Sequence, residues 1–215
     1  MHLVRRVVNP WGRKTFIVRL PSRARVLDVG CGNNSPLVTK TLRPDLYYVG
    51  LDIADYAQSE GSIAKADCYI RTSPEDFPST IRQLSCEFDA VISSHNLEHC
   101  YEPEAVLRAM LDRVGPNGML YLSFPCQESV KFPRRRGLNF FDDPTHTVPP
   151  NYERILQIIR ENGFDVKFVT ARYRPVIKAI LGLATEPMSA ILKKMFWGTP
   201  ALYGFESIIC AIRTN

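Results

Sequence analysis

Two glycines and an acidic residue stand where an apolar run of the chain ends. Residues 26–29 carry Val26, Leu27 and Val29 around Asp28, and the turn Gly30–Cys31–Gly32 follows. Glycines allow a sharp bend and let a ligand approach the backbone closely. A phosphate site would favour exposed N–H groups without an adjacent carboxylate. We therefore expect this turn to bind a ligand that carries a positive group.

Residues 26–35 resemble the first motif of class I S-adenosylmethionine (SAM)-dependent methyltransferases. The competing dinucleotide fingerprint needs a third glycine, and Ser35 stands in its place. An ordinary strand–turn–helix junction also remains open. The resemblance covers roughly residues 24–172 and 204–213, and it implies SAM as the cofactor, whose sulfonium matches the expected positive charge.

The resemblance also implies which residues hold the cofactor. Asp52 ends a second buried run, where a carboxylate can accept bonds from both ribose hydroxyls. Asp67 is expected at the end of a third strand, where it would meet the adenine amino group. Ser94 and His95 follow the fourth strand and would border the methionine tail. The cofactor contacts expected are Asp28, Gly30, Cys31, Gly32, Asp52, Ile53, Asp67, Cys68, Ser94 and His95.

Two histidines are candidates for proton transfer from an acceptor hydroxyl, because imidazole titrates near neutral pH. His95 lies at a strand end, and His146 belongs to the segment Asp142–Asp143–Pro144–Thr145–His146. This segment resembles a D-P-T-H element of glycan and secondary-metabolite methyltransferases. An Asp-Pro turn is the plainer interpretation. Several of these side chains are metal-donor types, but their spacing is not diagnostic, and we expect no metal.

Substrate contacts are expected in the segment that follows the fifth strand. Arg134, Arg135 and Arg136 offer guanidinium groups that bind carboxylate or phosphate with two hydrogen bonds, although such runs are more often solvated loops. Asp143 and His146 complete the expected substrate set.

Hydrophobic periodicity predicts strands and helices in alternation. We expect strands at 26–29, 47–53, 64–70, 88–94, 119–124, 165–171 and 206–212, with helices at 36–42, 102–114 and 152–162. This order predicts an α/β fold: a Rossmann-like seven-stranded, mostly parallel sheet with helices on both faces and an antiparallel last strand. We expect one domain over residues 1–215, with an N-terminal extension at 1–23 and insertions at 126–150 and 173–203.

The second insertion combines large apolar residues with Lys178, Lys193 and Lys194. A lid on the sheet edge is the favoured interpretation. A peripheral membrane contact through residues 175–197 is the alternative.

Composition bears on the class of partner and on the cellular compartment. The 215 residues carry a net charge of +5, less than a dedicated nucleic-acid binder needs. Six cysteines without C-x-x-C pairs argue against a zinc ribbon, and the chain shows no secretory leader or apolar span, so we expect reduced thiols in the cytoplasm. The oligomeric state stays open.

These observations predict an enzyme that transfers a methyl group from SAM to a small-molecule or glycan acceptor, at a hydroxyl. The sequence lacks the Asn/Asp-Pro-Pro-aromatic tetrapeptide of amino-group methyltransferases after the fourth strand, which argues against nucleic-acid amino groups as acceptors. An RNA methyltransferase and a non-catalytic SAM-binding domain remain as alternatives, and a dehydrogenase is more distant.

Overall fold

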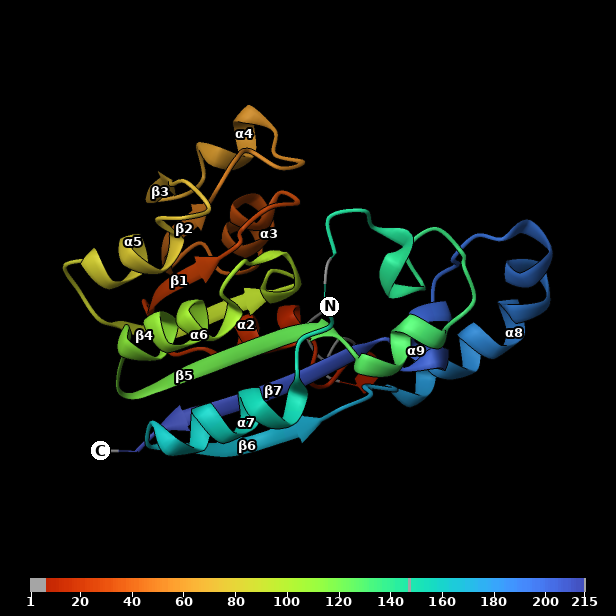
Figure 1. The fold of residues 1–215 in the computed structure, drawn as a ribbon. Helices are drawn as coiled ribbons and strands as arrows, with labels where there is room; N and C mark the ends of the chain where they lie inside the picture. Colours follow the sequence, from red (N-terminus) through yellow and green to blue (C-terminus); the bar gives the residue numbers. More distant parts are fainter. Residues whose placement is uncertain (1–6, 147, 215) are drawn as a thin grey trace.

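The computed structural model describes residues 7–146 and 148–214, so residues 1–6 of the N-terminal extension lie outside the described part. A seven-stranded sheet with the order β3-β2-β1-β4-β5-β7-β6 forms its centre (Figure 1). The strands are β1 (Arg25–Val29), β2 (Tyr47–Asp52), β3 (Cys68–Arg71), β4 (Phe88–Ser94), β5 (Val114–Pro125), β6 (Phe164–Thr170) and β7 (Glu206–Arg213).

Neighbouring strands from β3 to β5 run parallel, whereas β7 is antiparallel to both β5 and β6. The carboxyl ends of β1, β2 and β4 therefore meet at one edge, and the first residue of β7 reaches that edge from the opposite direction. The fold class predicted from the sequence is confirmed.

Helices cover both faces of the sheet. They are α2 (Arg13–Arg19), α3 (Ser35–Leu42), α4 (Glu60–Ile63), α5 (Phe77–Gln83), α6 (Pro103–Asp112), α7 (Tyr152–Glu161), α8 (Val176–Leu192) and α9 (Thr199–Tyr203), with 3₁₀ turns η1 (Leu97–His99), η2 (Gln127–Lys131) and η3 (Phe140–Asp142).

Alternation along the strands divides the core into two layers, because successive strand side chains point to opposite faces. Leu27 and Val29 pack in the layer that includes α5, α6 and α7. Val26 and Tyr48 pack in the layer that includes Ile17 of α2. Asp28 has the same parity as Val26, so its side chain points to the α2 layer. This orientation decides its role in the site.

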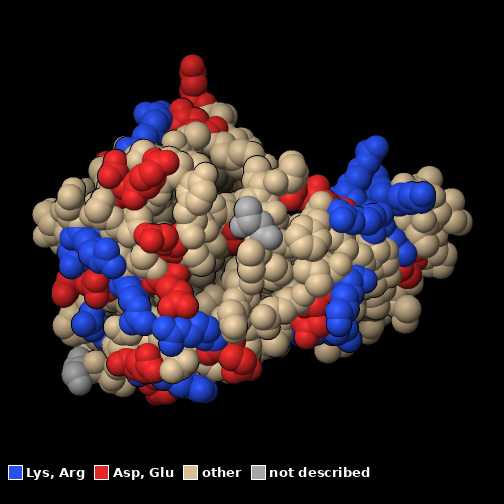
Figure 2. Space-filling model, viewed as in Figure 1, with Lys and Arg blue, Asp and Glu red and all other residues tan. Residues whose placement is uncertain are grey.

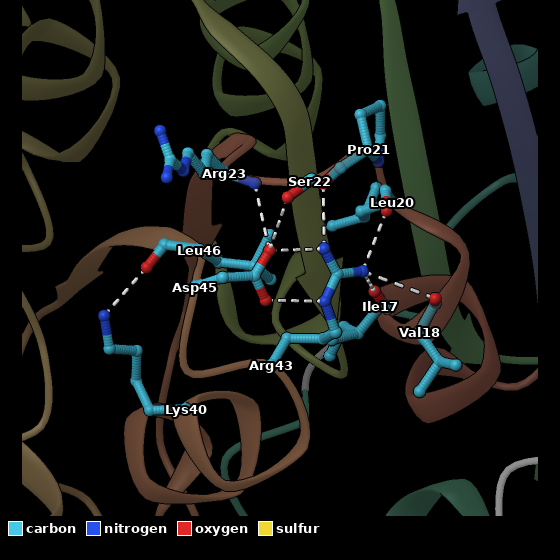
Figure 3. A network of polar contacts seen from close by, with 10 residues as sticks. All are labelled: Ile17, Val18, Leu20, Pro21, Ser22, Arg23, Lys40, Arg43, Asp45 and Leu46. Carbon is cyan, nitrogen blue, oxygen red and sulfur yellow. Dashed lines mark hydrogen bonds and ion pairs between the residues drawn. The ribbon is translucent and has the colours of Figure 1, made fainter.

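Arg43 joins the end of α2 to the segment between α3 and β2 (Figure 3). Its guanidinium pairs with Asp45 at 2.8 Å and donates to the carbonyl oxygens of Ile17 and Val18 in the last turn of α2, at 3.4 and 3.3 Å, and to that of Leu20 just after it, at 2.8 Å. The last carbonyls of a helix lack partners within that helix, and a cation there also interacts favourably with the helix dipole. Arg43 therefore fixes the end of α2, which carries Arg13 toward the site.

The two segments predicted as insertions lie together beyond the sheet. Residues 126–150 hold η2 and η3, while α8 and α9 connect β6 to β7. Figure 1 shows α8 extending away from the sheet. Among the described residues, no helix combines the length and apolar character needed to cross a membrane.

Candidate functional site

A cavity of about 1080 Å³ lies over the carboxyl ends of the central strands. In an open α/β sheet this edge is where ligands bind. The volume reaches the upper end of the ~300–1,000 Å³ range of small-molecule pockets, which is enough for a cofactor together with an acceptor. Its lining includes Arg13, Asp28, Gly30, Gly32, Asp52, Ile53, Glu75, Ser94, His95, Asn96, Glu98, His99, Asp143, Thr145, His146 and Phe205.

The glycine turn forms part of the cavity wall. Gly30 has a φ of +73°, and a Cβ on it would lie 2.4 Å from the side chain of Asn96. A Cβ on Gly32 would lie 3.1 Å from the carbonyl oxygen of Tyr56. Cys31, predicted as a cofactor contact, is fully buried, and its side chain packs in the α2 layer. Its backbone carbonyl accepts a hydrogen bond from Gln58 at 2.6 Å and its N–H donates to the Leu51 carbonyl at 3.4 Å, so the predicted contact of Cys31 with the cofactor stays a prediction.

Asp52 stands at the end of β2 and lines the cavity as predicted. Its Oδ1 accepts a hydrogen bond from the N–H of Ile53 at 2.8 Å, and burial raises the pKa of its carboxyl group. Ile53 is half exposed at the cavity wall. The carboxylate therefore has acceptor capacity left for a ligand's hydroxyl groups.

Asp28 is already neutralised within the protein. Arg13 pairs with its Oδ2 at 2.5 Å, and the Tyr48 hydroxyl donates to the same oxygen at 2.5 Å. The carboxylate is 1% exposed. The argument that this charge awaits a cationic ligand is therefore wrong, because alternation along β1 turns Asp28 toward α2. The residue still lines the cavity, so its contact with the cofactor stays a prediction. Its charge fastens α2 beside the cavity instead.

Asp67 and Cys68 lie at the opposite end of the sheet from the cavity. The predicted strand 64–70 begins only at Cys68, which pairs with Val49 near the start of β2. Asp67 accepts hydrogen bonds from Lys40 and from the N–H of Tyr48, both at 2.7 Å. The prediction that it meets adenine is wrong, because the strand starts where we expected it to end. Glu75, which follows β3, lines the cavity in its place.

His95 is held between two carboxylates at the end of β4. Its Nε2 lies 2.8 Å from Glu206 and its Nδ1 3.1 Å from Glu98. Burial alone would lower the pKa of the imidazole, but the hydrogen bonds to Glu206 and Glu98 raise it to about 10. This arrangement favours a protonated imidazole, which would not accept a proton, so the structure gives less support to His95 than to His146 as the base, and a catalytic role for His95 stays a prediction. Ser94, beside it, shares a 2.7 Å hydrogen bond with Ser123.

His146 and His99 face each other in the cavity with a ring separation of 4.6 Å. The Nδ1 of His146 lies 2.6 Å from the Phe140 carbonyl oxygen, which can only accept, so this nitrogen donates. The hydroxyl of Thr145 donates to Asp143 at 2.6 Å, so His99 Nδ1 donates to Thr145 at 2.8 Å. In the neutral form of each ring, the lone pair therefore lies on Nε2.

Glu98 is the third member of this cluster. It is 1% exposed, and its Oε2 makes no hydrogen bond within the described residues. One ligand atom each from Glu98, His99 and His146 lies within 4.8 Å of the others. Two imidazole nitrogens and a carboxylate oxygen are donor types suited to a divalent cation such as Zn²⁺. The sequence-based expectation of no metal stays a prediction.

The three arginines predicted to bind substrate do not line the cavity. Arg135 is buried and pairs with Glu186 of α8 at 2.6 Å. Arg134 donates to the Phe141 carbonyl at 2.5 Å, and Arg136 is exposed. Asp143 and His146, the other two predicted substrate contacts, do line it. Glu186, far along the chain, engages Arg135, so this arginine gives no support to a substrate clamp. A substrate contact by the exposed Arg134 and Arg136 stays a prediction.

Sequence reasoning missed Glu206 and Arg13. Glu206 meets His95 although 111 residues separate them. One signal was present: the first residue of an antiparallel last strand must lie at the same edge as the carboxyl ends of its parallel neighbours. No comparable signal singled out Arg13, because an extension before the first strand has no fixed place in the fold.

Comparison with known proteins decides the family. Residues 4–167 match a family model described as a methyltransferase domain. The chain belongs to this methyltransferase family. The resemblance of residues 26–35 to class I SAM-dependent methyltransferases is thereby confirmed.

Related proteins agree with this assignment. Ubiquinone biosynthesis O-methyltransferases from Xanthomonas axonopodis pv. citri (strain 306) and Chromobacterium violaceum are 30% and 32% identical over 122 and 123 residues. These matches include 54% of this chain and 49% and 51% of the relatives, so the chain spans about half the length of the curated relatives it matches. A SAM-dependent methyltransferase structure from Archaeoglobus fulgidus has the same fold, with a TM-score of 0.56, 16% identity and 98% of each chain covered.

Proposed function

We propose that this methyltransferase moves the methyl group of SAM to a hydroxyl of a small molecule. The observation that carries the proposal is one cavity that joins the glycine turn and Asp52 to two imidazoles with free Nε2 lone pairs. The O-methyltransferase names of the two relatives support a hydroxyl acceptor.

The residues divide into a donor side and an acceptor side. On the donor side, the ribose hydroxyls of SAM would bond to Asp52, and its methionine part would follow the turn at Gly30 and Gly32 toward Ser94. On the acceptor side, the hydroxyl would face His146. Asp143, which orients Thr145, would set the position of His99 beside it.

The transfer is an in-line displacement in which most of the acceleration comes from alignment and exclusion of water. The acceptor oxygen forms the new C–O bond as the C–S bond breaks, and the sulfur keeps that electron pair. The hydroxyl proton passes to Nε2 of His146, whose Nδ1 is fixed as a donor by Phe140. We propose His146 as the general base on this geometry.

An RNA substrate is less well supported, because the basic run 134–136 is absent from the cavity wall and Arg135 is engaged by Glu186. A glycan hydroxyl would fit the same mechanism as a small-molecule hydroxyl.

Radiolabelled methyl transfer tests the proposal. The protein is incubated with methyl-labelled SAM and a panel of dihydroxybenzene, glycan and RNA acceptors, and the binding of S-adenosylhomocysteine (SAH) is measured in parallel. We expect label in a dihydroxybenzene, and we expect His146→Ala to lose about 10²-fold in rate while its affinity for SAH is unchanged. Thr185→Ala, a change on α8 away from the cavity, is the control. SAH binding without transfer to any acceptor would favour a non-catalytic domain.

A further inference from the structure

Helix α8 is built with its apolar side outward. A surface helix normally turns its apolar residues to the core and its polar residues to water. In α8, the exposed side chains recur every three to four residues and are almost all apolar. They include Val176 (71% exposed), Ile180 (61%), Leu183 (64%), Met188 (54%), Ile191 (80%) and Leu192 (59%).

Polar contacts on the inner side fix this orientation. Glu186 pairs with Arg135 at 2.6 Å and also accepts from the Tyr203 hydroxyl at 2.6 Å. Ser189 is fully buried and donates to the Lys194 carbonyl at 2.8 Å. The outward apolar face is therefore a consequence of specific bonds, and rotating the helix would break them.

Close packing of glycines against the next segment adds to this restraint. A Cβ on Gly182 would lie 2.4 Å from the carbonyl oxygen of Gly198, which leaves no room for a side chain between α8 and the chain that leads into α9. The inner side of α8 is thus occupied along its length, and the outer side is not.

The surface around this apolar face is basic. Residues 172–205 contain five basic side chains and one acidic side chain, Glu186, which is engaged on the inner side. Lys193 and Lys194 are exposed directly after the helix, and Trp197 follows with 64% exposure. Figure 2 shows Lys and Arg gathered on the lobe that contains α8, next to uncharged surface.

We propose that α8 lies in the surface of a lipid bilayer that contains anionic lipids. Apolar side chains on one face, lysines that reach the headgroups and a tryptophan at the boundary are the features of helices that bind in this plane. Anionic headgroups are favoured over a protein partner because, within residues 172–205, lysines border the face and the single acid, Glu186, is paired with Arg135. A bilayer that contains anionic lipids complements both the charge and the apolar surface. The proposal goes beyond methyl transfer and does not depend on it.

Vesicle flotation tests this proposal with the whole protein. We expect binding to phosphatidylcholine vesicles that contain phosphatidylglycerol, weaker binding at high salt, and little binding to phosphatidylcholine alone. Ile180→Glu combined with Leu183→Glu is expected to reduce the bound fraction at least about tenfold, because it places two charges on the face that enters the lipid. Val148→Glu, at a residue 72% exposed outside α8, is the matched control and should bind as the wild type.

Substitution of Lys193 and Lys194 measures the electrostatic part of vesicle binding separately from the apolar part. Lys193→Glu with Lys194→Glu should reduce binding to anionic vesicles about tenfold. Trp197 emission should shift to the blue when anionic vesicles are added, and this shift should be absent in the Ile180→Glu/Leu183→Glu variant.

Other outcomes would overturn the proposal. Equal vesicle binding by the double glutamate variant would show that another surface contacts lipid. Failure of the wild type to bind anionic vesicles would also refute it. A dimer, detected by light scattering, that Ile180→Glu dissolves would assign this face to a second copy of the chain. SAH binding is measured for every variant and should stay unchanged, so a failure here is distinct from a failure of the methyltransferase proposal.

Discussion

The sheet edge and helix α8 use polar residues in opposite ways. Apolar side chains fill the core on both faces of the sheet, and charged groups such as Asp52 lie at its edge, where the strands end. In α8, the charged and polar groups Glu186 and Ser189 face the protein, and the apolar groups face outward. The first arrangement builds a pocket for a polar ligand, whereas the second offers an apolar surface. The two regions should therefore respond to different ligands and to different substitutions.

Gly30→Val should have the largest effect at the sheet edge. The residue has a φ of +73°, which β-branched side chains rarely adopt, and its Cβ would overlap Asn96. We expect SAH affinity, measured by calorimetry, to fall at least about a hundredfold. Gly61→Ala is the control, because a Cβ there meets nothing within 4 Å. Wild-type affinity in Gly30→Val would exclude the turn as the cofactor site.

Asp52→Ala is expected to cost about 2–4 kcal/mol of SAH binding free energy, because it removes the acceptor for two ribose hydroxyls. Asp55→Ala, three residues away and paired with Arg71 on the surface, is the matched control. Both variants should bind anionic vesicles like the wild type. A loss of vesicle binding in Asp52→Ala would contradict the separation of the two regions.

Arg13→Met tests the buried pair that anchors α2. Removing the guanidinium leaves the buried Asp28 carboxylate with the hydrogen bond from the Tyr48 hydroxyl but without its cation. We expect the free energy of unfolding to fall by about 3 kcal/mol. Denaturant titration measures this loss. Arg13→Met with Asp28→Asn should recover part of it, and no recovery would mean that the pair is not the cause.

Arg135→Met is the corresponding test in the α8 region. It leaves Glu186 with the Tyr203 hydroxyl, and we expect unfolding free energy to fall by about 1–3 kcal/mol. SAH affinity should not change, since Arg135 lies outside the cavity wall. Arg136→Met, at the exposed neighbour, is the control. A large loss of SAH affinity in Arg135→Met alone would restore the arginine to the substrate site.

The smallest expected effect is the contribution of His95 to the pH dependence of the melting temperature. Its pKa is raised from 6.5 to about 10 in the folded state, so the stabilisation it gives is fully present below about pH 6.5 and is lost as the pH rises through 10. The melting temperature of the wild type should therefore decline between pH 7 and 10 more steeply than that of His95→Gln. Parallel curves would mean that the histidine is not charged between its two carboxylates.

The sequence allowed the order of strands and helices to be predicted, because alternating and helical periodicities are local. It also located Asp52, since a buried run that ends in an acid marks a strand end. The surroundings of other candidates could not be predicted, because they depend on partners far along the chain: Glu186 engages Arg135 from 51 residues away, and Glu206 engages His95 from 111 residues away. The prediction for Asp67 was wrong for a different reason. Pairing with β2 determines that β3 begins after Asp67, and the sequence does not show this pairing.

A crystal structure of the complex with SAM tests the central claim most directly. We predict that the donor lies over the turn at Gly30 and Gly32, that its ribose hydroxyls bond to Asp52, and that its methyl group points toward His146. A donor bound elsewhere on the chain, or one whose ribose is held by groups other than Asp52, would contradict the account.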